Sequence, residues 1–279
     1  MVEAIDSVLS QSYPYFEVII VDDGSNDNTE QVIKDRYTPC PELIYFRKKH
    51  EERGVARNFG LKHAKGDYAV FLDSDDWMKT HYLETLNKII FEYPEVKLLA
   101  TKYRYDKGGK NHPFLQNLTE GWYDQSLFLR GNILGCNFCI KIKDHSFKLF
   151  HSDSVLALTE DWLFLLENLV DNKIFIKDEI CITMRQHDGR SIHNNRKVIE
   201  ARKKGTDWIL SNLKLSPANK KTLIAWSHHF CGVHEYLDFN RRPAMNEAIA
   251  AIKGIILQKH FWLLFVKSIV GKKLIKAIR

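Results

Sequence analysis

The sequence predicts an α/β protein: a doubly wound mixed sheet flanked by helices, followed by a helical C-terminal region. Two short apolar runs, residues 16–21 and 68–72, have the pattern of strands buried in a sheet. Helical patterns alternate with the predicted strands through the first hundred residues, which favours strand and helix units built around one sheet. From about residue 195 the hydrophobic pattern is helical to the end of the sequence.

The composition is that of a globular protein in a reducing compartment. Of the 279 residues, 44% are hydrophobic and 27% are charged, which is ordinary for a folded soluble chain. Five cysteines without a signal peptide argue against a disulfide scaffold, so we expect a cytoplasmic protein. The formal net charge of +6 favours anionic partners such as nucleotides or a membrane surface, and we expect no nucleic-acid partner.

The first part of the chain alternates helices with strands. An amphipathic helix comes first and ends before Pro14. The strand at 16–21 ends on Asp22 and Asp23, which either form a ligand-binding edge or make an Asx-type turn before a helix. The other elements predicted here are a helix from about residue 27, a strand at 42–47 and a helix at 54–64.

The strand at 68–72 ends on three closely spaced carboxylates, Asp73, Asp75 and Asp76. Open α/β sheets hold their ligands at the carboxyl ends of strands, and clustered carboxylates suit Mg²⁺ or Mn²⁺, which can carry a diphosphate. The alternative is an exposed acidic turn that caps a helix starting near Lys79. The motif alone leaves these two interpretations about equal.

The middle of the chain adds further strands and one apolar helix. Trp162 opens an apolar run that should be a buried helix, with Thr159 as its N-cap and Glu160 and Asp161 at its start. The remaining predictions are a strand at 96–104, a loop or hairpin at 106–119, a strand at 180–184 and a polar loop at 185–193.

Four ordered blocks of sequence stand out: residues 4–14 (Ala-Ile-Asp-Ser-Val-Leu-Ser-Gln-Ser-Tyr-Pro), 21–29 (Val-Asp-Asp-Gly-Ser-Asn-Asp-Asn-Thr), 54–60 (Gly-Val-Ala-Arg-Asn-Phe-Gly) and 71–76 (Phe-Leu-Asp-Ser-Asp-Asp). Together they resemble the successive signatures of family 2 glycosyltransferases of the GT-A fold. A weaker fifth block, residues 159–164 (Thr-Glu-Asp-Trp-Leu-Phe), extends the similarity into the middle of the chain. The resemblance implies inverting transfer of a sugar from a nucleotide diphosphate donor, assisted by Mn²⁺ or Mg²⁺.

The resemblance assigns donor-binding roles to residues of these blocks. Asp22 and Asp23 would face the base and ribose, and Arg57 the nucleotide. Asp73 would contact the ribose or the metal, and Asp75 would bind the metal. A carboxylate that accepts from a uracil-type imide would make the donor a UDP-sugar, and hexosyl or N-acetylhexosaminyl transfer would follow.

The same resemblance places the acceptor chemistry on the fifth block. Asp161 would be the catalytic base, and Glu160 would support acceptor contacts; a plain helix start is the alternative for both. A loop in family members closes over the diphosphate, so His187 or His193 would complete the metal shell, and Arg190 would meet phosphate charge.

The resemblance also divides the chain and marks a departure from the family. Residues 1–100 would form the nucleotide-sugar-binding half, 101–194 the acceptor-binding and catalytic half, and 195–279 the helical region. Family members usually begin with a strand, and Met1 falls where that strand should have ended; we expect that the true start lies upstream or that this product is incomplete.

Two other functions stay open. A sugar nucleotidylyltransferase could also use a doubly wound sheet and an acidic metal site, and an inactive nucleotide-binding remnant would agree with the missing first strand. The sequence lacks the Gly-x-Gly-x-x-Gly of a nicotinamide dehydrogenase and the Walker lysine motif of a nucleoside triphosphatase.

The C-terminal stretch is apolar and basic. Residues 261–266 (Phe-Trp-Leu-Leu-Phe-Val) lie among lysines, and no acidic residue follows Glu247. We expect either a basic amphipathic helix on an anionic membrane surface or a packed helix with a solvated basic end. A glycan or lipid-linked acceptor, in cell-surface polysaccharide or teichoic-acid-like synthesis, would fit the family and this tail.

Overall fold

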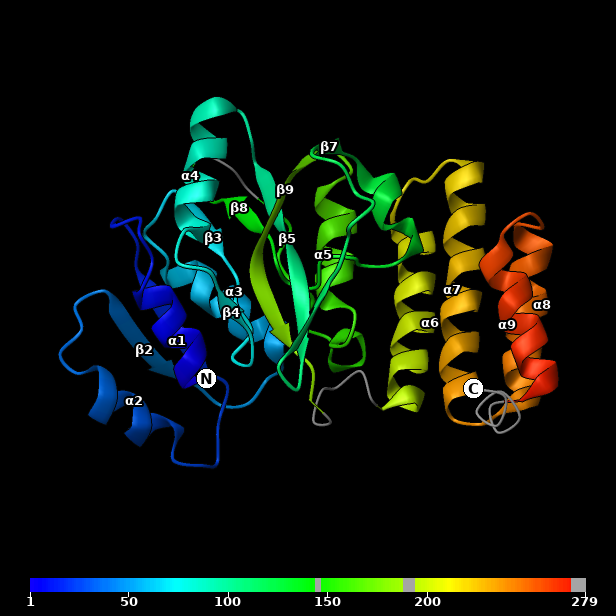
Figure 1. The fold of residues 1–279 in the computed structure, drawn as a ribbon, viewed down its shortest axis with the longest axis horizontal. Helices are drawn as coiled ribbons and strands as arrows, with labels where there is room; N and C mark the ends of the chain where they lie inside the picture. The colour runs from blue at the N-terminus through cyan, green and yellow to red at the C-terminus, as the bar shows by residue number, and fades with distance from the viewer. Residues whose placement is uncertain (144–146, 188–193, 272–279) are drawn as a thin grey trace. The chain divides into compact units, whose positions relative to one another are not determined.

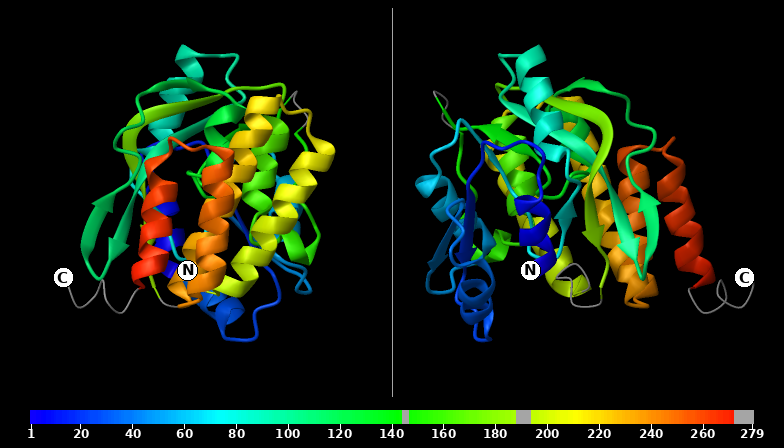
Figure 2. Two further views of the ribbon diagram at one scale, coloured as in Figure 1. Left: turned by 90° about the vertical axis from the view of Figure 1, so that its right-hand side faces the viewer. Right: turned by 60° about the vertical axis from the view of Figure 1, so that its left-hand side comes forward.

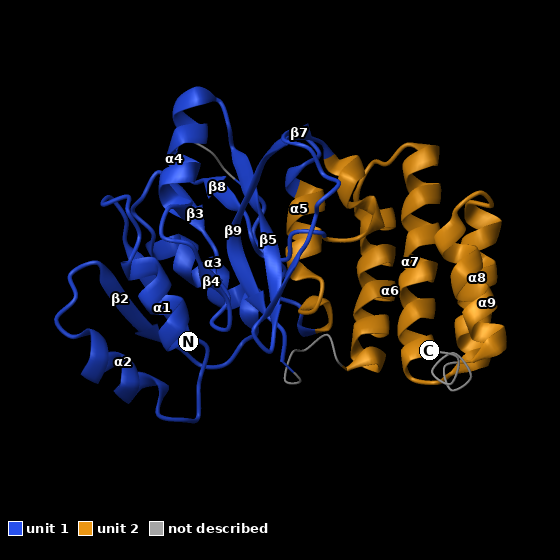
Figure 3. Ribbon diagram, viewed as in Figure 1, with its two compact units in different colours: residues 1–124, 133–154, 168–187 blue, residues 125–132, 155–167, 188–279 orange. Residues whose placement is uncertain are grey.

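The computed structural model describes residues 1–143, 147–187 and 194–271, which form two compact units (Figure 3). Each unit is assembled from segments that are separate in the sequence. Unit 1 consists of Met1–Asp124, Ile133–Ser154 and Asn168–His187, and unit 2 of Gln125–Asn132, Val155–Glu167 and Asp188–Arg279.

The N-terminal part of unit 1 contains a parallel pair of strands, β1 and β2, and the helices α1, α2 and α3; Figure 1 labels β2 and these helices. Strand β1 (Val18–Asp22) pairs in parallel with β2 (Leu43–Arg47), so that Asp22 lies opposite Arg47 and the carboxyl ends of both strands meet at one edge. The helices of this region are α1 (Val2–Leu9), α2 (Thr29–Tyr37) and α3 (Arg53–His63).

The larger sheet of unit 1 is mixed. Its strands run in the order β3-β8-β5-β9-β4; β6 pairs with β5 and β7 with β9. The β5–β9 pair is parallel and the other pairs are antiparallel. The β5–β6 hairpin is clearest in the right-hand view of Figure 2. The bounds are β3 (Tyr68–Val70), β4 (Trp77–Met78), β5 (Leu98–Lys107), β6 (Lys110–Pro113), β7 (Gly121–Tyr123), β8 (Cys139–Lys141) and β9 (Ile174–Arg185).

Helix α4 (Tyr82–Glu92) covers this sheet with an apolar stripe. Tyr82, Leu86 and Ile89, spaced four and three residues apart, are all buried and belong to one cluster with Leu99 and Phe175 of the sheet. Burying each large apolar side chain stabilises the fold by roughly 1.5–3 kcal/mol. The core therefore fixes the strands on which the acidic residues are mounted.

Unit 2 is helical. Asn194 and Ser216 cap α6 and α7 by accepting from the backbone N–H groups of Lys197 and Asn219. Small residues let α7 and α8 approach closely, since a Cβ on Gly254 would come 2.8 Å from Cβ of Ala225. The left-hand view of Figure 2 shows the last four helices side by side. The elements are η1 (Gln125–Arg130), η2 (Ser154–Leu156), α5 (Glu160–Asn168), α6 (Asn195–Asn212), α7 (Pro217–Leu237), α8 (Arg241–Gly254) and α9 (Lys259–Val270).

The predicted α/β class, with a sheet flanked by helices and helices at the C-terminal end, is confirmed. The strand expected at 68–72 is shorter than predicted: β3 ends at Val70, and its residues are half-buried rather than covered on both faces. The reason is that, among the residues the structure describes, β3 lies at the edge of its sheet and pairs only with β8. The helix expected near Lys79 begins at Tyr82.

Three other findings bear on the expected organisation. Residues 155–167, from the middle of the sequence, belong to the same unit as the C-terminal helices. All five cysteines are free, and Cys136 and Cys139 are buried. In the described ranges no helix is both long and apolar enough to cross a bilayer.

Candidate active site

Asp22, the last residue of β1, is buried and held by three groups. Its Oδ2 accepts a 2.7 Å hydrogen bond from the hydroxyl of Tyr45, and its Oδ1 accepts one of 2.7 Å from the backbone N–H of Ser25. Nε of Arg47 lies 4.0 Å from Oδ2. Burial acts to raise the pKa of Asp22, but the hydrogen bonds and the Arg47 charge outweigh it, so the pKa is lowered. Asp22 is therefore a fixed, ionised carboxylate.

Asp23 is paired with basic groups that follow β2. Nζ of Lys48 lies 2.7 Å from Oδ1, Nδ1 of His50 lies 2.8 Å from Oδ2, and the backbone N–H of Glu51 donates to Oδ1 at 3.0 Å. The turn that follows Asp23 requires glycine. Gly24 has φ +82°, and a Cβ there would come 2.9 Å from the backbone nitrogen of His50. The ends of β1 and β2 are thus locked together.

Arg57 links α3 to the end of β3. Its Nη2 donates to Oδ1 of Asp73 at 2.8 Å, and its guanidinium lies over the ring of Phe150, 5.4 Å from the centroid. Asn58 holds the Phe150 backbone, donating to its carbonyl at 2.8 Å and accepting from its N–H at 2.9 Å. The Arg57 side chain is only 12% exposed, so its position is set by packing as well as by charge.

The three carboxylates after β3 converge. One oxygen from each of Asp73, Asp75 and Asp76 lies within 4.8 Å of the others. Nε2 of His187, which follows β9, lies 2.9 Å from Oδ2 of Asp75. Oxygen ligands with one imidazole suit Mn²⁺ or Mg²⁺, and the side chains of Asp75 and His187 are both partly exposed, at 30% and 41%. The donor set therefore fits a divalent ion.

Asp76 anchors β9 to this cluster. It is 4% exposed and accepts a 3.0 Å hydrogen bond from the backbone N–H of Arg185. The Arg185 guanidinium lies 4.9 Å from the ring centroid of Trp77 and pairs with Glu3 of α1. Because His187 follows Arg185 by two residues, this anchor positions the imidazole next to Asp75.

In unit 2, Glu160 and Asp161 form the first turn of α5. Glu160 is buried, with 2% exposed, and Asp161 is half-buried. Oδ1 of Asp161 accepts a 2.7 Å hydrogen bond from the backbone N–H of Trp162. The hydroxyl of Thr159 donates to the carbonyl of Leu156 at 3.1 Å. This hydrogen bond runs back to the preceding turn and is not the predicted N-cap bond to α5.

Trp162 fixes the start of α5 against the rest of unit 2. Its indole Nε1 donates to the carbonyl of Phe128 at 2.7 Å. The guanidinium of Arg202 lies over its ring, 3.7 Å from the centroid, and Nε of Arg202 donates to Oγ of Ser227 at 3.0 Å. The backbone of α6 passes close by at Gly205, where a Cβ would come 3.1 Å from Oγ1 of Thr159. The carboxylates of this turn are therefore mounted on a rigid support.

The structure brings together four of the residues singled out from the sequence, Arg57, Asp73, Asp75 and His187, and it places Asp22 and Asp23 at the shared end of β1 and β2. Arg190 and His193 lie outside the described residues. Glu160 and Asp161 belong to unit 2, whereas the six others belong to unit 1: Asp22, Asp23, Arg57, Asp73, Asp75 and His187.

Sequence reasoning missed the partners of Asp22 and Asp23. Tyr45, Lys48 and His50 lie on or just after β2, whose carboxyl end meets that of β1. The signal was present, because parallel neighbouring strands end at the same edge of a sheet and residues 42–47 were already a predicted strand. Asp76, by contrast, is buried and anchors β9 rather than capping α4.

The sequence matches known proteins across its first half. The family model described as glycosyl transferase family 2 matches residues 1–154. Glycosyltransferase GlyA of Streptococcus pneumoniae is 32% identical over 105 residues, covering 38% of this chain and 15% of that protein. The putative teichuronic acid biosynthesis glycosyltransferase TuaG of Bacillus subtilis is 41% identical over 92 residues, covering 32% of this chain and 36% of TuaG. The matched part of this chain thus spans only a small share of these relatives.

A solved structure agrees with the fold over nearly the whole chain. The crystal structure of S. aureus TarS residues 1–349 in complex with UDP-GlcNAc superimposes with a TM-score of 0.67 at 21% identity, covering 94% of this chain and 79% of that one. At this identity the similarity shows the GT-A fold. The family model covers more than half of the sequence, and the chain belongs to glycosyl transferase family 2.

Proposed function

We propose that this chain transfers a sugar from a UDP-sugar to a hydroxyl acceptor with inversion, using a divalent ion held by Asp75 and His187. The observation that carries the proposal is the 2.9 Å approach of His187 to Asp75 within the group of three carboxylates. A turn that only caps a helix would not require the imidazole of His187, which comes from the end of β9. Support also comes from the family of the chain.

The ion, Mn²⁺ or Mg²⁺, would neutralise charge on the departing diphosphate. Asp75 and His187 are its ligands in this proposal. Asp73 is hydrogen-bonded to Arg57 and Asp76 to the Arg185 backbone, so these two carboxylates hold the cluster together. Arg57 and Asp73 then present a cation and an acceptor to the nucleotide, and Arg190 meets phosphate charge.

Asp22 and Asp23 bind the base and ribose in this proposal. Asp22 accepts one hydrogen bond on each oxygen, and an ionised carboxylate offers about four acceptor sites. It therefore keeps acceptor capacity for the imide N–H of uracil, but its side chain is 1% exposed, so the base must displace the groups that cover it. The Tyr45 and Ser25 bonds fix its orientation in advance, which lowers the cost of binding.

Asp161 is the base in the proposed reaction. An acceptor hydroxyl is a weak nucleophile until its proton is removed, and inversion requires that removal on the face opposite the diphosphate. The proton passes to a carboxylate oxygen of Asp161, the acceptor oxygen bonds to the anomeric carbon, and the bond to the diphosphate breaks. Glu160 supports acceptor contacts.

The transferred group is a hexosyl or N-acetylhexosaminyl unit in this proposal, and the acceptor is a glycan or lipid-linked glycan. The crystal structure of TarS contains UDP-GlcNAc, and TuaG is described as a putative glycosyltransferase of teichuronic acid biosynthesis. We extend these chemistries to this chain as synthesis of a cell-surface polysaccharide or a teichoic-acid-like glycan at the cytoplasmic face of the membrane.

Helix α9 supplies a surface for that membrane contact. Its apolar residues Trp262, Leu263 and Val266 are 45%, 51% and 52% exposed, whereas Phe261 and Leu264 are buried. Lys259 and Lys267 lie on the same helix. An exposed apolar strip with lysines suits the headgroup region of an anionic bilayer.

A donor screen with purified protein tests the proposed activity. Nucleotide sugars of several bases are offered with Mn²⁺ and a panel of glycan acceptors, and products are identified by mass. UDP release with a mass gain of one sugar supports the proposal. Pyrophosphate release from a sugar phosphate would indicate a nucleotidylyltransferase instead, and UDP binding without turnover would indicate a nucleotide-binding remnant.

A further inference from the structure

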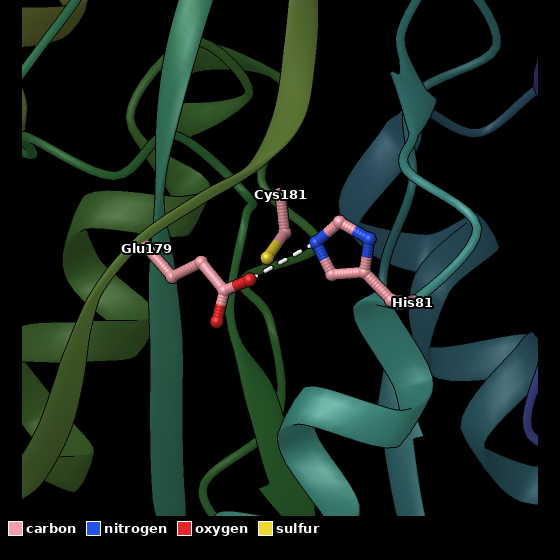
Figure 4. A group of neighbouring side chains, drawn as sticks. All are labelled: His81, Glu179 and Cys181. Carbon is pink, nitrogen blue, oxygen red and sulfur yellow. Dashed lines mark ion pairs between the residues drawn. The ribbon is translucent and has the colours of Figure 1, made fainter.

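A second group of metal-ligating side chains lies in unit 1, away from the acidic cluster. Figure 4 shows His81, Glu179 and Cys181 turned toward one another. Nε2 of His81 lies 3.0 Å from Oε1 of Glu179. One ring nitrogen of His81, one carboxylate oxygen of Glu179 and Sγ of Cys181 all lie within 4.8 Å of one another. Nothing in the proposed transfer reaction uses these residues.

Two elements far apart in the sequence bring these ligands together. His81 directly precedes α4, and its side chain makes no capping hydrogen bond to that helix. Glu179 and Cys181 lie two residues apart on β9, where its pairing with β5 is irregular, and a carboxylate oxygen of Glu179 and Sγ of Cys181 lie within 4.8 Å of each other. The backbone N–H of Lys79 donates to the Cys181 carbonyl at 2.8 Å, which fixes the segment carrying His81 against β9.

We propose that His81, Glu179 and Cys181 bind Zn²⁺. Thiolate, imidazole and carboxylate together are the ligand types that zinc combines, and bonds of 2.0–2.3 Å in a tetrahedron put ligand atoms about 3.5 Å apart. Small side-chain adjustments bring the three atoms to that spacing. The Cys181 thiol gives up its proton to solvent as the sulfur binds the ion.

The surroundings suit a site with three protein ligands and one open position. A hollow of about 480 Å³ is lined by His81 and Glu179 and also by Thr85, Lys88 and Lys177, whereas Cys181 is buried and does not line it. Water can reach the fourth position from this side. Oγ1 of Thr85 donates to Oε2 of Glu179 at 3.4 Å, an outer contact of the kind that orients a ligating carboxylate.

This site and the acidic cluster are distinct. They occupy opposite ends of the β4–β9 pair: Asp76 contacts Arg185, whereas Lys79 contacts Cys181. Four residues of extended strand separate those points by about 13 Å. The ligand chemistries also differ, because the acidic cluster lacks sulfur and suits harder ions. A zinc ion here would tie α4 to β9 and so stabilise the strand that carries Arg185.

Cobalt substitution tests the site in the full chain. Co²⁺ is titrated into protein treated with a chelator and a non-thiol reductant, and the near-ultraviolet thiolate-to-cobalt charge-transfer band is recorded. We expect the band to saturate at one equivalent and to disappear when Zn²⁺ is added. Cys181→Ser should abolish it, His81→Gln should weaken binding by about 100-fold, and Thr85→Val by about 10-fold.

Three controls make the result specific. Cys40, the one cysteine that is not buried, is the thiol most open to adventitious cobalt, and Cys40→Ser should leave the band unchanged. Asp75→Ala should also leave it unchanged. To exclude zinc bound at the acidic cluster, melting is compared in an Asp75→Ala background. There Zn²⁺ should raise the melting temperature of the protein with His81, with or without Cys40→Ser, but not of the His81→Gln variant, whose side chain is partly exposed.

The proposal is overturned if wild-type protein gives no thiolate band at one equivalent of Co²⁺, or if the band survives in folded Cys181→Ser. Loss of the band in Cys40→Ser would also overturn the proposal, because the cobalt would then be bound by Cys40. His81 and Glu179 would then be an ion pair between α4 and β9 with no metal.

Discussion

The hydroxyl of Tyr45 donates a 2.7 Å hydrogen bond to Oδ2 of Asp22, across the parallel β1–β2 pair. Asp22 is buried and Tyr45 is half-buried, and burial together with the hydrogen bond to the charged Asp22 raises the pKa of Tyr45. The phenol therefore stays protonated and donates throughout the physiological pH range. This bond aims the carboxylate that we assign to the nucleotide base.

Tyr45→Phe should weaken UDP binding and lower stability. Loss of a hydrogen-bond donor to a buried carboxylate lowers the free energy of unfolding by about 1.5–3 kcal/mol. The melting temperature at pH 7 should therefore fall. UDP affinity by calorimetry should fall as well. Tyr37→Phe is the matched control, because its hydroxyl donates to Asp6 at 2.8 Å in the same unit, and it should lose stability without losing UDP affinity.

The stability effect of Tyr45→Phe should depend on pH. The pKa of Asp22 is below its usual 3.8, so its contribution is present above pH 3.8 and is lost as pH falls through the lower folded value. Removing the Tyr45 bond raises the folded pKa. Melting temperatures measured from pH 7 downward should therefore differ most between wild type and Tyr45→Phe at neutral pH and converge in acid. A difference that grows in acid would contradict the account of Asp22.

Much of unit 1 could be predicted from the sequence because its signals are local. Apolar runs that end on acid predicted β1 and β3, and the helical patterns predicted α1 and α3 within a few residues. The acidic cluster was also predictable, since Asp73, Asp75 and Asp76 are neighbours in the sequence.

Other features depend on pairing between distant segments and have no local signal. His81 and Cys181 meet only because β4 pairs with β9, and the sequence offers no pattern for a two-residue strand such as β4. The extent of β3 likewise follows from its edge position. The Arg202–Trp162 contact joins α5, which ends at Asn168, to α6, which begins at Asn195, and strand β9 lies between them in the sequence.

Arg202→Ala should destabilise unit 2. The side chain is 3% exposed, and its removal takes away a cation–π contact and a hydrogen bond to Ser227, which together contribute about 3 kcal/mol. Thermal unfolding should show a lower melting temperature. Lys203→Ala, which breaks a 2.9 Å pair with Glu247 from a side chain that is 54% exposed, should cost less than about 1 kcal/mol. Equal losses in the two variants would show that the contact with Trp162 contributes little.

Vesicle binding through α9 should depend on salt. Flotation with vesicles of mixed neutral and anionic lipid should recover the protein at low ionic strength and recover less as salt is raised. Lys259→Glu with Lys267→Glu should abolish recovery. Lys220→Glu with Lys221→Glu changes the net charge by the same amount on α7, where both lysines are exposed. This double variant should keep most of the vesicle recovery. Equal loss in both double variants would indicate general charge attraction rather than contact through α9.

Asp161→Asn should separate catalysis from donor binding. The amide keeps the size of the carboxylate and its acceptor oxygen but has little proton affinity, so turnover should fall by about 10² to 10⁴. UDP affinity should hardly change. Asp207→Asn, an exposed aspartate of α6 in the same unit, should have near-normal turnover. A folded Asp161→Asn protein with full activity would reject Asp161 as the base and direct attention to Glu160.

The central claim is that Asp75 and His187 hold a divalent ion that binds the donor diphosphate. Calorimetry of UDP binding, in Mn²⁺ and in chelator, tests it most directly, with wild type, Asp75→Ala and the zinc-site variant Cys181→Ser compared. We predict tight binding by wild type and Cys181→Ser in Mn²⁺, and weak binding by wild type in chelator. Asp75→Ala should bind weakly in both conditions. Equal UDP affinity of wild type with Mn²⁺ and with chelator would contradict the claim.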